Sequence, residues 1–237
     1  MTEGRAGMLV LDNVSIAQGS FALDADFTVQ QGRKVAVIGP SGAGKSTILG
    51  AISGFIPLAR GRIHLADKDV SDAPPGDRPI AMLFQDNNLF PHLSVAQNVS
   101  LGLRPNLKLS ADDKAHVAAA IRRVGLAGFE ARLPGALSGG QQSRAALARV
   151  LVQNKPLVLL DEPFAALGPA LRHEMLDLVA ALAGETGATL LMVTHAPEDV
   201  ARIADDVIFV EGGRAHAPAP AADLMNNPPP ALRAYLG

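Results

Sequence analysis

The sequence predicts an α/β protein in which helices cover both faces of a mainly parallel β-sheet. Three observations predict this fold: short apolar segments separated by turn residues near the start, a helical pattern in the middle, and strict strand–helix alternation afterwards. A chain of 237 residues, 48% of them hydrophobic, is long enough to bury a core without disulfides. We therefore expect one domain over 1–237, without internal repeats.

The first third of the chain contains short apolar segments of strand length. Turn-forming residues at Gly19-Ser20 and Gln31-Gly32 separate the first three, as expected for strands of a small sheet. We expect strands at Met8–Val14, Phe27–Val29, Val35–Ile38, Arg62–Leu65 and Ile80–Phe84. After the third strand, Ile48, Leu49 and Ile52 have helical spacing.

Between about 88 and 154 the pattern becomes helical. Ser110-Ala111-Asp112-Asp113 resembles a capping box and predicts a helix through Val124. Ser138-Gly139-Gly140 opens a second helix that ends near Gln153. This stretch is interpreted as a helical insertion between two strands of the main sheet, with the core at about 8–87 and 155–215.

The last third of the chain alternates strands with helices, which implies parallel strands joined by crossover helices. The expected order is Leu157–Leu160 (strand), Pro169–Leu182 (helix), Thr189–Val193 (strand), Pro197–Ala204 (helix) and Val207–Val210 (strand). The segment 216–237 is rich in Ala and Pro, and we expect a loosely held tail with two short helices.

Composition excludes several function classes. The chain has no Cys, which removes disulfides, thiolate metal sites and Cys nucleophiles. Lys and Arg total 21 against 23 Asp and Glu, so the basic excess typical of nucleic-acid binders is missing and we expect no nucleic-acid partner. No apolar run reaches the roughly 20 residues of a membrane span, and the first seven residues lack the apolar core of a signal peptide. We expect a cytoplasmic, soluble protein.

The strongest motif is Gly39-x-x-x-x-Gly44-Lys45-Ser46, between a strand and a helix. Glycines allow backbone N–H groups to converge on phosphate oxygens, the helix start adds its positive end, and the lysine adds a point charge. A serine at the last position suits Mg²⁺. The alternative, a Gly-rich turn that happens to contain Lys, fits the context less well. The candidate phosphate-binding residues are Gly39, Pro40, Ser41, Gly42, Ala43, Gly44, Lys45, Ser46 and Thr47.

Two acids follow a buried strand at Asp161-Glu162. The carboxyl edge of a parallel sheet is where open α/β folds bind ligands. Asp161 is the candidate metal ligand, and Glu162 is the candidate general base for an attacking water. In isolation, two acids at a strand end would more often be a solvated turn.

Leu137-Ser138-Gly139-Gly140-Gln141 is a third candidate, because a Gly-rich loop that opens a helix presents a second set of backbone amides to an anion. Most Ser-Gly-Gly triplets are plain turns. With this loop, one chain would carry two phosphate-binding loops roughly a hundred residues apart.

These three motifs, in this order, resemble the nucleotide-binding subunit of ABC transporters over about residues 8–215. The resemblance implies a P-loop NTPase (RecA-like) core with an N-terminal antiparallel β subdomain and an inserted α-helical subdomain. It implies an ATPase that uses ATP and Mg²⁺. Two copies would pack head to tail, so that Ser138, Gly139, Gly140 and Gln141 of one chain complete the nucleotide site of the other.

The resemblance also assigns roles that the residues alone do not. Gln85 would sense magnesium, the attacking water and the membrane partner, and could ligate the metal. His195 would contact the γ-phosphate, although a lone histidine is more often a packing residue. His64, His92, His116, His173 and His216 have no such context.

The segment from Phe84 to Val99 is similar to the cassettes of small-solute importers, most of all those of thiamine importers. It implies a bacterial ATPase on the cytoplasmic face of the inner membrane, transmembrane permease subunits as partners and, indirectly, a solute-binding protein. Leu89, Phe90 and Leu93 are then candidate permease contacts, or else ordinary core. Alternatives are the ATPase of another importer, for an inorganic or organic anion, a metal or a polyamine, and a weakly hydrolysing nucleotide-binding regulator. An ABC ATPase acting on DNA or ribosomes would carry a long insertion or a doubled cassette, and this sequence has neither. A GTPase would need an Asp that recognises guanine after Asn154-Lys155-Pro156, where this sequence has Leu157.

Three positions depart from the family pattern. Gln142 follows Gln141 where the family commonly has a basic residue. Gln18 occupies the place of an aromatic residue that stacks on adenine, with Phe21 the nearest ring, so weaker selectivity for ATP over GTP is expected. Gly168 replaces an aspartate that bridges the two cassettes. We expect measurable but poorly coupled ATP hydrolysis.

Overall fold

The computed structural model describes residues 7–236, and the side chain of Leu236 is not described. Most of the N-terminal stretch considered above for a signal peptide therefore lies outside the described residues. The strands form one sheet in the order β5-β4-β1-β2-β10-β9-β3-β8-β7-β6, with β11 paired to β9. In the part of the chain that the structure describes, no helix is long and apolar enough to cross a membrane.

The N-terminal part of the sheet is antiparallel, as expected. Strand β1 (Leu9–Gln18) pairs antiparallel with β2 (Phe21–Val29) and with β4 (Arg60–Leu65). Both hairpin strands are longer than the apolar segments that predicted them. The reason is alternation: along β2, Leu23, Ala25 and Phe27 are buried while Asp24 and Asp26 are exposed, and a strand with one wet face includes polar residues.

The second part of the sheet is parallel. Its strands are β3 (Lys34–Ile38), β6 (Ile80–Leu83), β7 (Leu157–Asp161), β8 (Thr189–Val193) and β9 (Asp206–Glu211). They pair in the order β9-β3-β8-β7-β6, all in parallel. Short strands β5 (Lys68–Asp69), β10 (Arg214–Ala215) and β11 (Ala219–Pro220) complete the sheet.

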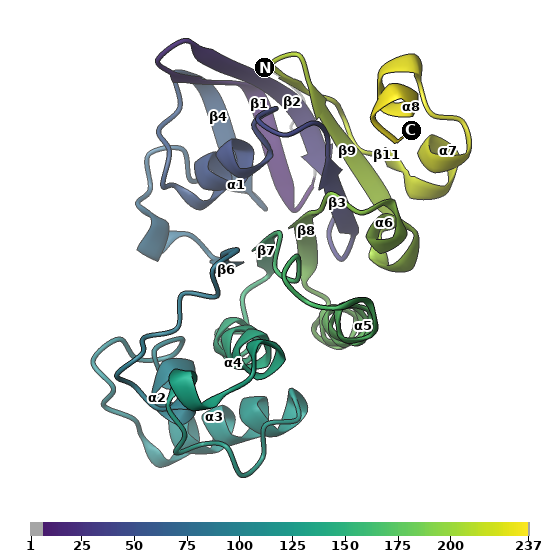
Figure 1. Ribbon diagram of the computed structural model, residues 1–237. Coiled ribbons are helices and arrows are strands. Elements are labelled where there is room, and N and C mark those ends of the chain that lie inside the picture. The colour runs from purple at the N-terminus through teal and green to yellow at the C-terminus, as the bar shows by residue number, and fades with distance from the viewer. Residues whose placement is uncertain (1–6, 237) are drawn as a thin grey trace.

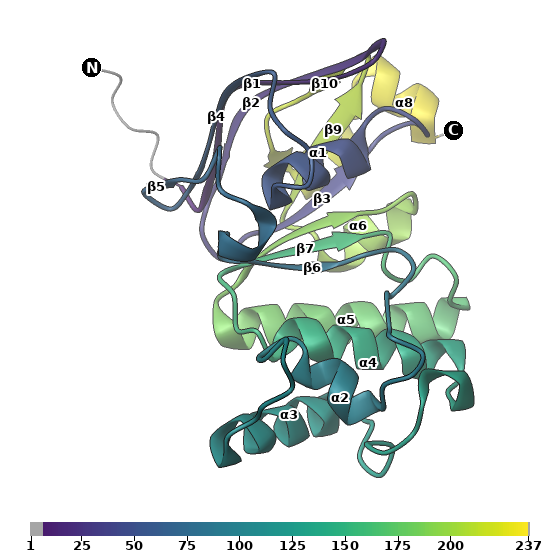
Figure 2. The same ribbon diagram turned by 90° about the vertical axis from the view of Figure 1, so that its left-hand side faces the viewer.

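Helices cover both faces of the parallel strands, which explains why these strands are apolar without interruption. Helix α1 (Lys45–Ser53) lies between the antiparallel and parallel parts of the sheet, and α5 (Pro169–Thr186) lies on the opposite face (Figures 1 and 2). On β3, Val35 and Val37 join the α1 core, whereas Ala36 and Ile38 join the core that contains α6 (Pro197–Ile203).

The helical insertion forms a layer beyond α5 (Figure 2). It contains α2 (Val95–Ser100), α3 (Ala111–Arg123) and α4 (Gly139–Leu151), which share one apolar core with α5. The capping box predicted at Ser110 is confirmed: its hydroxyl accepts the Asp113 N–H at 3.0 Å, and the Asp113 carboxylate accepts the Ser110 N–H at 3.0 Å. Two 3-10 turns, Pro75–Asp77 and Pro134–Ala136, lie in the connections.

The prediction of a loosely held tail is wrong. Helices α7 (Ala221–Asn226) and α8 (Pro230–Leu236) pack beside β9 (Figure 1). Leu232 is completely buried, in a cluster with Ile38 and Phe209. Composition suggested flexibility because Ala and Pro dominate, but Leu232 and Ala221 are buried, and Leu224, Met225 and Tyr235 pack against the same cluster.

Candidate active site

Three neighbouring parallel strands bring the candidate residues to one edge of the sheet. Val193 of β8 pairs with Val37 of β3 on one side and with Asp161 of β7 on the other. The phosphate loop, His195 and Glu162 follow these positions by one or two residues. Because the strands share a direction and a register, residues up to about 155 positions apart in the chain converge.

Glycines shape the phosphate loop. Gly44 is the N-cap of α1 with φ 104°, and Gly42 has φ +75°, conformations that favour residues without Cβ. A Cβ on Gly39 would lie 2.0 Å from the Val210 carbonyl oxygen, so this position must stay Gly. The N-terminus of α1 has no side-chain cap, so its first amides remain available to an anionic ligand.

Lys45 is held over this loop. Its ammonium donates hydrogen bonds to the Gly39 carbonyl at 2.8 Å and to the Pro40 carbonyl at 2.9 Å. The residue is only 5% exposed. Burial lowers the pKa of Lys45, and the nearby carboxylates of Glu162 and Asp161 oppose that shift. These two hydrogen bonds fix the ammonium group over the loop.

Ser46 and Asp161 form the candidate metal site. The Ser46 hydroxyl donates to the Asp161 carboxylate at 2.9 Å. Burial raises the pKa of Asp161, partly offset by this hydrogen bond. A hydroxyl and a carboxylate side by side suit Mg²⁺, which takes oxygen ligands and fills its remaining positions with substrate phosphates and water. No group of three or more His, Cys, Asp or Glu side chains suited to a metal occurs in the described part of the chain.

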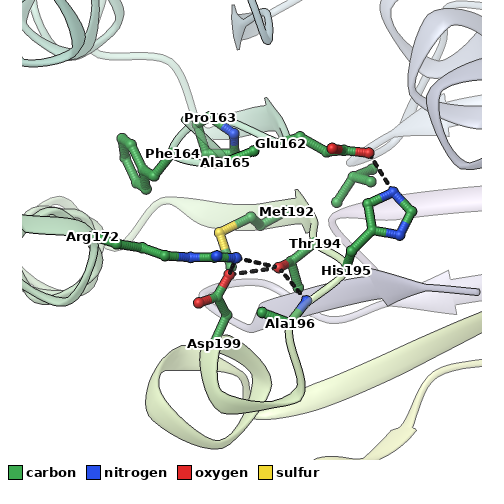
Figure 3. Close-up of a pocket in the computed structure, with 11 residues that line it drawn as sticks. Glu162, Pro163, Phe164, Ala165, Arg172, Met192, Thr194, His195, Ala196 and Asp199 are labelled. Atoms are coloured by element: carbon green, nitrogen blue, oxygen red, sulfur yellow. Dashed lines mark hydrogen bonds and ion pairs between the residues drawn. The ribbon is translucent and has the colours of Figure 1, made fainter. Parts of the chain in front are cut away.

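Glu162 and His195 face each other across the edge of the sheet (Figure 3). The Glu162 Oε1 lies 2.5 Å from His195 Nε2. Glu162 has a positive φ of 45°, and its N–H donates to the Val193 carbonyl at 3.2 Å. Non-glycine residues in this region are uncommon and concentrate at functional sites.

A cavity of about 300 Å³ lies between the phosphate loop, Glu162 and His195. Besides phosphate-loop residues, Gln18, Phe21, Glu162 and His195 line it. A Cβ on Gly44 would lie 2.6 Å from the tip of the Phe21 ring, so this ring rests on the phosphate loop. Gln18, which occupies the place of the adenine-stacking aromatic residue, and Phe21, the nearest ring, therefore both line the cavity.

Gln85 and the 138–141 loop lie elsewhere. Gln85 is exposed in the turn after β6, the edge strand, and does not line the cavity. Ser138 caps α4: its hydroxyl accepts the Gln141 N–H at 3.3 Å, and the Gln141 side chain accepts the Ser138 N–H at 2.9 Å. This capping box was missed, although Ser-x-x-Gln before an apolar run signals it.

The backbone at Gly168 has an ordinary conformation. Gly168 is the N-cap of α5 with φ −63° and ψ 156°, a region open to every residue. A Cβ there would meet nothing within 4 Å. Gly168 therefore adopts no conformation that requires a glycine.

A phosphate loop after β3 and, across β8 from it, a candidate metal-binding acid and a candidate base at the end of β7 are the arrangement of a P-loop nucleoside triphosphatase. Comparison with known proteins narrows the class. Residues 23–165 match the family model described as ABC transporter. The chain is 58% identical to the "Thiamine import ATP-binding protein ThiQ" of Cereibacter sphaeroides over 230 residues, 97% of this chain and 100% of the relative. It is also 58% identical to the protein of the same name from a Ruegeria species, with the same coverage.

Solved structures of ABC transporter components are also similar to this chain. The ATP-binding cassette MJ0796, in a dimeric post-hydrolysis state bound to ADP and Pi, is 29% identical with a TM-score of 0.79, covering 90% of this chain and 99% of that one. The cassette cbiO1 from Clostridium perfringens, part of the ABC transporter complex cbiONQ, is 28% identical with a TM-score of 0.82, covering 94% and 92%. The chain belongs to the ABC transporter family, and it is an ABC-type ATPase.

Lys45→Ala tests the phosphate loop. The variant loses a charge-assisted contact of about 1.5–3 kcal/mol, so we expect affinity for a fluorescent ATP analogue to fall at least about tenfold. Lys114→Ala, on the exposed face of α3, is the control and should bind normally. Equal affinity for the two variants would contradict this assignment of Lys45.

Proposed function

We propose that this protein is the ATP-hydrolysing subunit of a thiamine importer of the bacterial inner membrane. The observation that carries the proposal is full-length similarity: 58% identity over 97% of this chain and 100% of a relative named for thiamine import. The candidate site supports it, because the phosphate loop, Asp161, Glu162 and His195 lie at one edge of the sheet.

ATP binding would use the amides at the start of α1 and the ammonium of Lys45. The hydrogen bonds from Lys45 to Gly39 and Pro40 would be exchanged for bonds to the β- and γ-phosphates. Ser46 and Asp161 would hold Mg²⁺, which neutralises charge on the phosphates. Because Lys45 is buried, its charge is little screened by solvent and acts strongly on a bound phosphate.

Hydrolysis would depend on Glu162 and His195. Water attacks the γ-phosphorus, the bond to the ADP oxygen breaks, and Glu162 accepts the proton that the water loses. His195 would leave its contact with Glu162 and donate a hydrogen bond to the γ-phosphate, which frees the carboxylate to take the water's proton. Gln85, exposed beside this edge, would reach the metal and the attacking water only after the turn at 85–88 moves.

Dimerisation would complete the site. Ser138 and Gly139, at the start of α4, are exposed and do not line the cavity of their own chain, and a Cβ on Gly139 would meet nothing within 4 Å. This open approach suits a close contact with the nucleotide bound by a second copy, arranged head to tail. The capping box already satisfies the Ser138 and Gln141 amides in the free chain.

The permease would dock on a groove of about 480 Å³ lined by Met82, Phe84, Asn88, Leu89, Phe90, Pro91 and Arg149. Phe90 is 46% exposed and Phe55, which stacks edge-on against Phe84 at 5.7 Å, is 58% exposed. Exposed aromatics around a groove are typical of protein interaction sites. A short helix of the permease on the cytoplasmic side is the occupant we propose, and a solute-binding protein would deliver thiamine from outside.

Thiamine uptake tests the proposed function. A strain of the source bacterium lacking this gene should lose uptake of radiolabelled thiamine, and the wild-type gene should restore it. Labelled polyamine, phosphate and a divalent metal are the comparison solutes. Loss of uptake for one of these with normal thiamine uptake would overturn the choice of solute and leave the ATPase assignment intact.

Glu162→Gln tests the general base. The substitution keeps the shape of the side chain and removes its basicity, so ATP should bind without being hydrolysed. We expect an ATP-dependent dimer on size exclusion and loss of turnover by at least about a hundredfold. A monomer with full turnover would exclude Glu162 as the base.

Gly168→Asp tests coupling between two sites. The position accepts any side chain, and an Asp N-cap stabilises a helix by a few tenths of a kcal/mol over Gly, so the variant should fold. A carboxylate at the dimer interface should raise the Hill coefficient for ATP hydrolysis. Gly168→Asn caps the helix without the charge and serves as the control; an unchanged Hill coefficient in Gly168→Asp would contradict the idea.

A further inference from the structure

A buried cluster of polar side chains lies directly behind His195, in a cavity of about 290 Å³ (Figure 3). Arg172 of α5 donates to the Asp199 carboxylate of α6 at 2.5 Å and to the Thr194 hydroxyl at 3.3 Å. The Thr194 hydroxyl donates to the same carboxylate oxygen at 2.5 Å. Asp199 is 3% exposed. Nothing in the sequence marks this cluster, because Arg172 and Asp199 are 27 positions apart.

The cluster holds the turn that carries His195. The Ala196 N–H donates to the Thr194 hydroxyl at 3.1 Å, so one side chain joins the residues on both sides of the histidine. The Thr194 N–H donates to the Val37 carbonyl at 3.2 Å, which ties the turn to β3. The exposed imidazole is therefore presented to Glu162 by a backbone that is fixed from behind.

The same cluster reaches the first turn of α5. The Arg172 N–H donates to the Gly168 carbonyl at 2.9 Å. The adjacent Leu171 packs on Gly140, where a Cβ would lie 2.3 Å from a Leu171 methyl group. One helical turn thus contacts both the 138–141 loop and, through Arg172, the turn of His195.

Stability alone does not account for this pair. Replacing a buried ion pair by apolar residues of similar volume is often neutral or stabilising. By contrast, an ion pair whose hydrogen bonds are directional fixes the geometry of the groups it joins. The two atoms that remain without hydrogen-bond partners, Arg172 Nε and Asp199 Oδ1, show that the cluster is not arranged to satisfy every polar group.

We propose that Arg172 and Asp199 are positioning residues. Through Thr194 they hold His195 in its contact with Glu162, and they connect that histidine to the first turn of α5. The inference rests on the proposed ATP hydrolysis at Glu162 and His195. It assigns no substrate contact to Arg172 or Asp199.

The test is a double substitution, Arg172→Met with Asp199→Leu, which removes the pair without leaving a buried charge. We expect kcat for ATP to fall by about 10- to 100-fold, as when a catalytic group is misplaced, while KM and the affinity for a fluorescent ATP analogue stay unchanged. Arg172→Lys should recover part of kcat. Thermal unfolding checks that each variant is folded.

A matched control lies on the same two helices. Arg202 of α6 pairs with Asp177 of α5 at 2.6 Å on the surface, and Arg202→Met with Asp177→Leu should leave kcat unchanged. In a His195→Ala background, the Arg172 and Asp199 substitutions should cause no further loss of kcat, because their effect passes through that histidine.

An equal loss of kcat in the His195→Ala background, an equal loss in the control pair, or no loss at all would each overturn the proposal. So would a His195→Ala variant with normal kcat. These assays use the full chain without permease or solute. If these effects on kcat are observed but the importer proves to carry a solute other than thiamine, only the proposed solute is contradicted.

Discussion

The parallel register of β3, β8 and β7 is the constraint on which the site depends. Val37, Val193 and Asp161 form one row across the three strands. The segments that follow this row therefore place the phosphate loop, His195 and Glu162 at the same edge of the sheet. A shift of one strand by a single residue would exchange its two faces, moving the apolar set that packs on α1 to the other side. Core packing on both faces therefore also fixes the geometry of the site.

The polar and charged groups of the candidate site have partners within the protein. Lys45 binds two loop carbonyls, Ser46 binds Asp161, and Glu162 contacts His195. A buried charge left unpaired, such as that of Lys45, would cost several kcal/mol, so its two hydrogen bonds stabilise the folded site. In the proposed mechanism, phosphates would replace the two carbonyl partners of Lys45 with fully charged ones.

Helix starts connect this chemistry to the rest of the fold. The start of α1 leaves its amides free, whereas that of α4 is closed by its own Ser138 and Gln141. The start of α5 carries Leu171 against Gly140 and Arg172 against the turn of His195. The same local feature, a helix N-terminus, thus occurs in three forms: uncapped amides in α1, a capping box in α4, and first-turn side chains that contact neighbouring segments in α5.

The sequence by itself determined the motifs and most elements. The 39–46 loop needs glycines at defined positions, and the strand Thr189–Val193 and the start of α5 at Pro169 are found where the pattern predicted them, because local conformation and periodicity are encoded locally. The roles assigned to Gln85 and to the 138–141 loop remain predictions. Only the tertiary structure decided which residues meet: the packed C-terminal tail, the contact of Glu162 with His195, and the cluster of Arg172, Thr194 and Asp199. These depend on strand order and helix packing between distant segments, and no local pattern of side chains specifies them.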